Sequence, residues 1–201
     1  MTIPPTARPG GLAPLKISCT SSDCDADLHC FKATQKLARE DKVGACRTCG
    51  AELIDWDRVH ARRLDDVTFT FEQLRHEMIR HHFWHLDFDE SAVKHAVRKG
   101  RLLLHEAARR RIETSVLRAG QAFDGRQTPR EGNTIFYAQH ATAACCRTCI
   151  EYWHGVPKDR DLTAEEADYL TTLVIAFLDE RLPDLADHPV SVPRKSNGRH
   201  D

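Results

Sequence analysis

The chain has 201 residues, of which 41% are hydrophobic and 29% are charged, and its net charge is −1 at neutral pH. That composition suffices for a packed core and fits a soluble protein with one medium domain and a small module. No apolar run approaches the roughly 18 residues that a membrane-spanning helix requires, which argues against a membrane protein. The near-zero net charge excludes no class of partner.

The chain contains eight cysteines, and its N-terminus lacks the basic-then-apolar pattern of a signal peptide. We therefore expect a cytoplasmic protein whose thiols stay reduced, which favours metal binding over disulfide bonds. Cysteine and histidine donors suit one or two zinc ions per chain, and they do not distinguish zinc from iron.

Changes in composition predict four segments. Residues 1–14 are rich in Pro and Gly and are expected to form a disordered arm, and residues 188–201 a disordered tail. Residues 15–57 are expected to form a small cysteine-rich module that begins with a short strand at 15–18. Residues 58–187 are expected to form a helical domain. The predicted fold class is mainly α with a small zinc-ribbon module, α+β overall, with one or two short strands around a helix that carries Cys and His.

Two cysteine-containing turns in the N-terminal module resemble each other. Residues 24–28 match residues 49–53, which gives Cys19 and Cys46 equivalent upstream positions. Paired turns of this kind build a zinc ribbon in which four thiolates close a tetrahedron, and the metal supplies folding free energy that so small a core lacks. The predicted ligands are Cys19, Cys24, Cys46 and Cys49, with Cys30 as the alternative to Cys19.

A helix is predicted over residues 70–85, with a capping box at its start. His81, His82 and His85 lie three or four residues apart on it. Two of these histidines can reach one metal ion, and any of them is a candidate general base. The structural alternative is that they pack beside neighbouring aromatic rings.

Two further helices, at residues 90–99 and 101–118, meet at a glycine and resemble a helix-turn-helix. The second carries three adjacent arginines at 109–111. Lys and Arg are in excess over residues 58–126, whereas Asp and Glu are in excess over residues 151–188. A basic face that contacts nucleic acid is one interpretation, and mutual neutralisation across a helical interface is the other.

The most informative stretch is NTIFYAQHATAACCRTCIEYWHGVP, residues 133–157. It predicts a buried strand at 135–138 and a helix at 143–153 that ends at Gly155. The spacing H-x5-C-x2-C-x4-H offers two thiolates and two imidazoles, which suits tetrahedral zinc. The predicted ligands are His140, Cys146, Cys149 and His154.

Alternatives exist at this second site. His154 follows Cys149 by five residues, so a continuous helix would turn it away and leave three ligands plus water, a catalytic arrangement. Cys146 and Cys149 can instead do thiol chemistry near a helix N-terminus, or belong to an inert core. Cys145 is expected in the core rather than among the ligands.

The loop at residues 123–132 places Arg126 and Gln127 just ahead of the cysteines. A cation and an amide at that position are candidates to bind an anionic substrate group. A plain surface connection is the alternative.

The runs DGRQTP, AQHATAACCRTC and YWHGVP, followed by LTAEE, resemble an uncharacterised bacterial family of unknown function with the signature QHATATCCRxC…WHGIP. The resemblance covers residues 121–182 closely and the helices before them more loosely. It implies no activity, and Ala144, where the signature has Thr, removes one hydroxyl near the site. It implies one functional unit made of Asp124, Gly125, Gln127, Thr128, Pro129, Gln139, His140, Cys145, Cys146, Cys149, Trp153 and His154.

Three functional hypotheses follow. The leading one is a zinc-binding cytoplasmic protein that contacts nucleic acid through the ribbon and the basic helices. The second is a zinc-dependent hydrolase or nuclease, with its metal at the second Cys/His site and a base from the histidine-rich helix. The third is a thiol oxidoreductase that uses Cys146 and Cys149.

Overall fold

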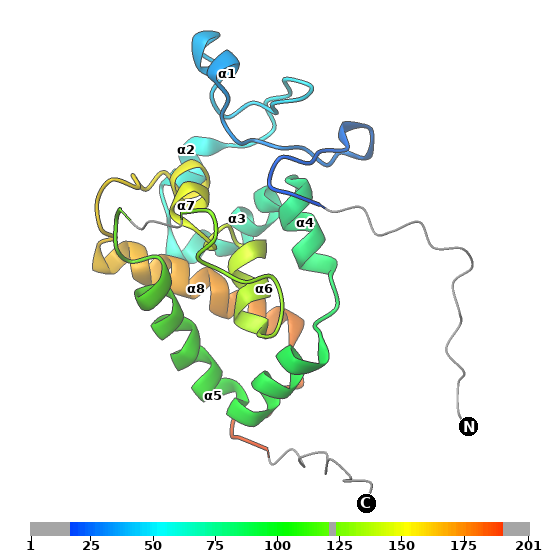
Figure 1. Ribbon diagram of the computed structural model, residues 1–201, viewed down its shortest axis with the longest axis vertical. Coiled ribbons are helices and arrows are strands. Elements are labelled where there is room, and N and C mark those ends of the chain that lie inside the picture. Colours follow the sequence, from blue (N-terminus) through cyan, green and yellow to red (C-terminus); the bar gives the residue numbers. More distant parts are fainter. Residues whose placement is uncertain (1–16, 121–123, 191–201) are drawn as a thin grey trace, which may run out of the picture.

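A computed structural model describes residues 17–120 and 124–190 (Figure 1). Within these residues the regular structure is helical, which confirms the mainly α class. Two 3-10 turns lie at Cys24–Ala26 and Leu64–Asp66. The α-helices are α1 (Gln35–Arg39), α2 (Trp56–His60), α3 (Val67–Leu74), α4 (Met78–His85), α5 (Glu90–Ser115), α6 (Thr134–Ala141), α7 (Arg147–His154) and α8 (Ala164–Arg181).

The strands expected from the sequence are not formed in the described residues, where two isolated bridges are the only β pairing. Residues 135–138 lie inside α6, which begins where the Asn133 side chain accepts a hydrogen bond from the Ile135 N–H. The strand prediction there was wrong because a short apolar run fits a buried helix as well as a buried strand. The expected strand at 15–18 lies partly outside the described residues, and its described part, Ile17 and Ser18, is irregular.

α6 and α8 form the centre of the helical body, with α5 along one side (Figure 1). α6 packs against α4, α5 and α8, and seven of its eight residues are buried. α8 begins at the predicted capping box, in which the Thr163 side chain and the Glu166 carboxylate each accept a backbone N–H. None of the described helices has both the length and the apolar character to cross a membrane.

The predicted helix over residues 70–85 is interrupted between α3 and α4. At this break the backbone forms hydrogen bonds to the N-terminal module: His29 N–H donates to the His76 carbonyl at 2.7 Å, and Met78 N–H donates to the His29 carbonyl at 2.9 Å. These bonds take the place of bonds within a continuous helix, and they attach the module to the helical body. The predicted boundary near residue 58 falls inside α2, which packs against α7.

Aromatic rings fill the space between the module and the body. Phe31 meets Trp153 edge-on at 6.0 Å between ring centroids, and Trp56 lies 5.2 Å from the same ring. Trp56 also donates its Nε1–H to the Gly44 carbonyl at 3.0 Å. The module, drawn blue to cyan in Figure 1, therefore rests on α7 through a shared apolar contact.

Three of the arginines of α5 make contacts within the fold. Arg101 pairs with Asp179 and Arg109 with Asp168, each at 2.6 Å, and both acidic residues lie on α8. Arg111 turns the other way and donates to the Gln139 side chain at 3.2 Å. These pairs fit the neutralisation interpretation, and nucleic-acid contact stays a prediction from the sequence.

α5 is broken at Gly100, as the sequence indicates, and the chain after α8 crosses this break. Arg101 N–H and Leu102 N–H donate to the carbonyls of Ala186 and Asp187. Gly100 has φ 69 and ψ 169, a conformation that is essentially restricted to glycine. The tail predicted to be disordered from 188 is thus in contact with α5 through residue 190, and residues 1–16 and 191–201 lie outside the described part.

Replacing Gly100 by Ala tests this crossing. A Cβ there would lie 2.4 Å from the carbonyl carbon of His188, so we expect a loss of unfolding free energy of about 3 kcal/mol or more. Gly120→Ala is the matched control, since Gly120 has φ +64 and, apart from its chain neighbours, no atom of the described residues lies within 4 Å of its Cβ position, and it should cost only about 1 kcal/mol. Urea unfolding of both variants measures the difference, and equal losses would contradict the account.

Candidate metal centres

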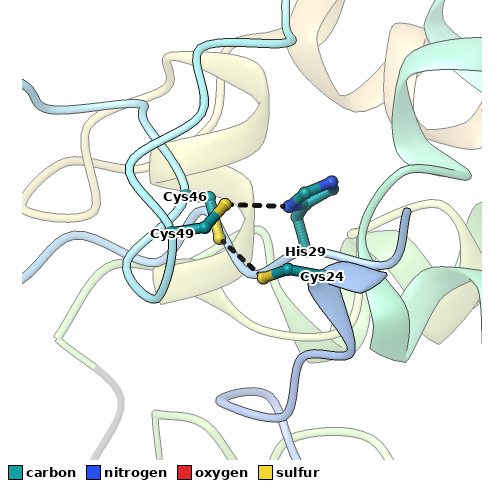
Figure 2. A group of neighbouring side chains, drawn as sticks. All are labelled: Cys24, His29, Cys46 and Cys49. Carbon is teal, nitrogen blue, oxygen red and sulfur yellow. Dashed lines mark hydrogen bonds between the residues drawn. The ribbon is translucent and has the colours of Figure 1, made fainter. Parts of the chain in front are cut away.

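Four donor side chains of the N-terminal module converge in Figure 2: Cys24, His29, Cys46 and Cys49. Their ligand atoms all lie within 4.8 Å of one another. Cys46 and Cys49 come from a turn closed by the Cys46 N–H to the Ala51 carbonyl at 2.8 Å. The four side chains together are called the module centre below.

The distances in the module centre match one tetrahedral zinc ion. The Sγ atoms of Cys24 and Cys46 are 3.8 Å apart, and the Cys49 Sγ is 3.5 Å from His29 Nδ1. With Zn–S bonds of about 2.3 Å and Zn–N bonds of about 2.0 Å, a tetrahedron has S···S edges of about 3.8 Å and S···N edges of about 3.5 Å. The donors therefore already stand at ligand spacing.

His29 is oriented by a carboxylate. Its Nε2 donates to Asp27 Oδ1 at 3.0 Å, which leaves Nδ1 facing the thiols. Burial lowers the pKa of His29, but the bonds to Asp27 and to the thiols outweigh it and raise this pKa to about 8. Metal-binding histidines commonly use such a carboxylate partner to fix the ring and its tautomer.

The module centre differs from the predicted ligand set at one position. Cys24, Cys46 and Cys49 are brought together, whereas Cys19 lies elsewhere and His29 stands in its place. The prediction matched the two turns cysteine by cysteine, but the first turn supplies a cysteine and a histidine in the spacing C-x4-H and the second supplies two cysteines in the spacing C-x2-C. The C-x4-H spacing was the overlooked signal.

Cys30, the predicted substitute for Cys19, is fully buried and is not in the module centre. Its Sγ donates to the carbonyl of Cys19 at 3.3 Å. Cys30 therefore supports the backbone of the segment that carries Cys19.

Three more thiols form a second group: Cys145, Cys146 and Cys149. They are buried, and their Sγ atoms lie within 4.8 Å of one another. We call this group the trithiol centre. Ala143 has φ 56 and turns the chain between α6 and α7, so that Cys146 becomes the N-cap of α7 and its Sγ accepts from the Cys149 N–H at 3.4 Å. The predicted helix from residue 143 thus begins four residues later, and Gly155 ends it as expected.

A buried ion pair lies beneath the trithiol centre. Arg80 and Glu77 are both 0% exposed, and Arg80 Nε donates to Glu77 Oε2 at 2.9 Å. The guanidinium also donates to the Cys149 Sγ at 3.1 Å and to the His140 carbonyl at 2.6 Å. The interaction with Cys145 and the charge of Arg80 lower the pKa of Cys149, but other neighbouring thiols and burial outweigh them and raise this pKa above its usual range.

The carboxylate of Glu77 is in turn fully hydrogen-bonded. It accepts the Trp153 Nε1–H at 2.6 Å and the Tyr152 hydroxyl at 2.9 Å, besides Arg80. Both aromatic residues lie on α7. The ion pair therefore joins α4 to α7 and fixes the floor of the trithiol centre.

The thiols of this centre resist ionisation without a cation. A hydrogen bond with Cys145 and burial raise the pKa of Cys146 to about 12. A thiol with so high a pKa is a poor nucleophile at neutral pH, which disfavours the thiol oxidoreductase. A bound metal ion removes that barrier because coordination deprotonates a thiol outright.

The trithiol centre opens into a cavity of about 430 Å³. Three basic side chains, Lys32, Arg126 and Arg130, line it together with His140 and the carboxylate of Asp124. Asp124 is tied to the start of α7, where it accepts the Thr148 hydroxyl at 2.6 Å and the Thr148 N–H at 3.2 Å. The Thr128 hydroxyl donates to the Cys145 carbonyl at 2.9 Å and holds the loop over the thiols.

The two histidines predicted as ligands here stand apart from the trithiol group. His140 lines the cavity, but its ring stacks on Phe83 at 4.4 Å and its Nε2 donates to the Pro129 carbonyl at 3.1 Å. His154 is fully buried at the far end of α7, with Nε2 donating to the Thr142 carbonyl at 2.9 Å. Burial lowers the pKa of His140 to about 4 and that of His154 to about 3, so both rings are neutral at pH 7.

Of the other predicted site residues, one lines the cavity and the rest do not. Arg126 lines the cavity, whereas Gln127 does not: its carbonyl accepts from Arg111. The histidines of α4 lie outside the cavity lining, with the rings of His81 and His85 packed together at 4.2 Å. His82, beside them, is also absent from the lining. The cavity histidine is therefore His140.

Glu77→Gln tests the ion pair. The substitution keeps the shape and leaves the buried Arg80 uncompensated, so we expect a loss of about 3–5 kcal/mol in unfolding free energy. Glu180→Gln is a matched control: Glu180 also accepts from an arginine and a tryptophan Nε1–H, but its side chain is 46% exposed, and the cost should stay below about 1 kcal/mol. Chemical denaturation of both variants measures the two losses of unfolding free energy. A loss for Glu77→Gln no larger than that of the control would contradict the role of the buried ion pair.

The comparisons with known proteins agree with the sequence resemblance. Residues 68–179, more than half of the chain, match the model of a family described as Domain of unknown function (DUF4186). No solved structure matches the chain. The matched residues include the trithiol centre, the ion pair beneath it and the loop that lines the cavity. The chain belongs to the DUF4186 family.

Proposed function

We propose that the protein is a zinc-dependent hydrolase that acts on a small anionic substrate at the trithiol centre, with a second, structural zinc ion at the module centre. The observation that carries the proposal is the combination of three clustered thiols and three basic side chains around one cavity. Structural zinc sites have four protein ligands, as in the module centre, whereas catalytic sites have three and leave one position for water. The two centres differ in this respect.

The basic side chains favour an anionic substrate. Lys32, Arg126 and Arg130 converge on the cavity from two parts of the chain, the module and the loop before α6. Positive charge at such a site attracts an anion and stabilises negative charge that develops during hydrolysis. The cavity, at about 430 Å³, has the size of a small-molecule site.

Two groups of the chain adapt the trithiol centre to hydrolysis. When bound, zinc supplies a Lewis acid and lowers the pKa of a coordinated water. Three thiolates would weaken that effect by donating negative charge, and the guanidinium of Arg80 on Cys149 counteracts them. His140 replaces the histidines of α4 as the proposed general base: its Nε2 donates to the Pro129 carbonyl, so Nδ1 is the nitrogen left to accept a proton.

Metal content tests the first half of the proposal. Elemental mass spectrometry of the full chain, purified without a metal-binding tag, should find two zinc ions per chain. His29→Ala should reduce the content to one, and His76→Ala should leave it at two, because His76 also neighbours Asp27 but lies outside the module centre. A single zinc ion in the unaltered protein, lost with His29, would leave no metal for the trithiol centre and refute the proposal.

Hydrolysis of matched chromogenic esters tests the second half. We expect turnover of p-nitrophenyl phosphate in preference to neutral p-nitrophenyl acetate, and loss of turnover in Cys146→Ser. Arg126→Ala should raise KM by about tenfold, a change of about 1.4 kcal/mol, with a smaller effect on kcat. Arg110→Ala, an exposed α5 arginine outside the cavity lining, is the control. Preference for the neutral ester, or no turnover with two zinc ions bound, would contradict the assignment.

A further inference from the structure

A fourth cysteine lies at the trithiol centre. Cys19 lines the same cavity as Cys145, Cys146 and Cys149. The three other thiols belong to the residues that lead into α7 and to its first turn, whereas Cys19 belongs to the N-terminal module. Two segments more than a hundred residues apart in sequence therefore contribute sulfur atoms to one place.

The position of Cys19 is held by specific contacts. Arg130, on the cavity loop, donates to the carbonyl of Ile17 at 2.9 Å. Cys30 donates its Sγ hydrogen to the carbonyl of Cys19 at 3.3 Å, and the Ser21 N–H closes a turn on the Ser18 carbonyl at 3.1 Å. The backbone around Cys19 is thus bound on both sides, and its thiol is placed at the trithiol centre by the fold.

The spacing of the sulfur atoms points to a single ion. Thiols within 4.8 Å of one another fit the edges of about 3.8 Å of a tetrahedron with Zn–S bonds of about 2.3 Å. A multi-iron cluster interposes several metal and sulfide atoms between its cysteines and spreads them further apart. One ion with three thiolates has one tetrahedral position left, and Cys19 is the further thiol that lines the same cavity.

We infer that Cys19 is the fourth thiolate ligand of the trithiol centre, and that an anion entering the cavity takes its coordination position. This inference rests on the proposed function. The exchange is a ligand substitution: the metal–sulfur bond to Cys19 breaks, a bond to an oxygen of the anion forms, and the freed thiolate takes a proton from solvent. No electrons are transferred. In the resting protein Cys19 fills the position that the three buried thiols leave open, and its release restores that open position.

Cys19 suits the role of the displaceable ligand. Cys145, Cys146 and Cys149 are each at most 5% exposed and are fixed by α7 and Arg80. Cys19 is only partly buried and comes from outside the helical body. Its release needs a local movement of the segment at residues 17–19, whereas the release of any other thiol needs α7 to move.

Cadmium-113 NMR of the full chain tests the inference, because the resonance of the ion moves upfield with each thiolate that it loses. The unaltered protein should show two resonances, a downfield one from four thiolates and another from the three thiolates and one imidazole of the module centre. Cys19→Ser and Cys19→Ala should each move only the downfield resonance. The unchanged module resonance in the same spectrum reports an intact fold.

The outcomes separate the inference from the proposed function. If Cys19→Ser moves the module resonance, or moves none, Cys19 is not a ligand of the trithiol centre, while the hydrolase proposal stands. A single resonance in the unaltered protein refutes both. Inorganic phosphate should move the downfield resonance of the unaltered protein toward its position in Cys19→Ser. If phosphate does not move this resonance, an anion does not displace Cys19, even if the Cys19 variants show that Cys19 is a ligand.

Discussion

The buried ion pair of Glu77 and Arg80 is the interaction on which the arrangement of the candidate site depends. Two opposite charges removed from water are stable together only when every remaining donor and acceptor is satisfied. Here Tyr152 and Trp153 complete the carboxylate, and Cys149 and the His140 carbonyl complete the guanidinium. Three of these partners lie on α7 and the fourth on α6, so satisfying the charges joins α4, α6 and α7 beneath the cavity.

The same region ties the module to the body. Glu77 lies at the break between α3 and α4, and this break exists because residues 76 and 78 exchange backbone hydrogen bonds with His29 instead of with a helix. His29 is also the imidazole of the module centre. A metal ion bound there would hold the turn at residues 24–29, and with it the neighbouring Cys19 and Lys32 that line the cavity. The module centre thus contributes to the shape of the cavity at the trithiol centre.

Local patterns predicted much of this protein, and long-range pairing decided the rest. The capping box of α8, the glycine that ends α7 and three of the four side chains of the module centre were predicted from spacing alone. The helical state of residues 135–138 was not, because an apolar run of that length carries no period. The position of Arg80 could not be predicted, since nothing near it in sequence indicates that α7 covers it. The same holds for Cys19, which was predicted with the other cysteines of the module, whereas the structure places it in a cavity with thiols more than a hundred residues away.

The extent of the family match bears on how the two centres are related. Residues 68–179 contain the three thiols, the ion pair, His140 and the two arginines of the cavity. They do not contain Cys19, Lys32 or any ligand of the module centre. The family region of this chain therefore contains the three clustered thiols and two of the three basic side chains that line the cavity. The module adds the thiol of Cys19 and the amine of Lys32, so the lining of the cavity is shared between the helical body and the module.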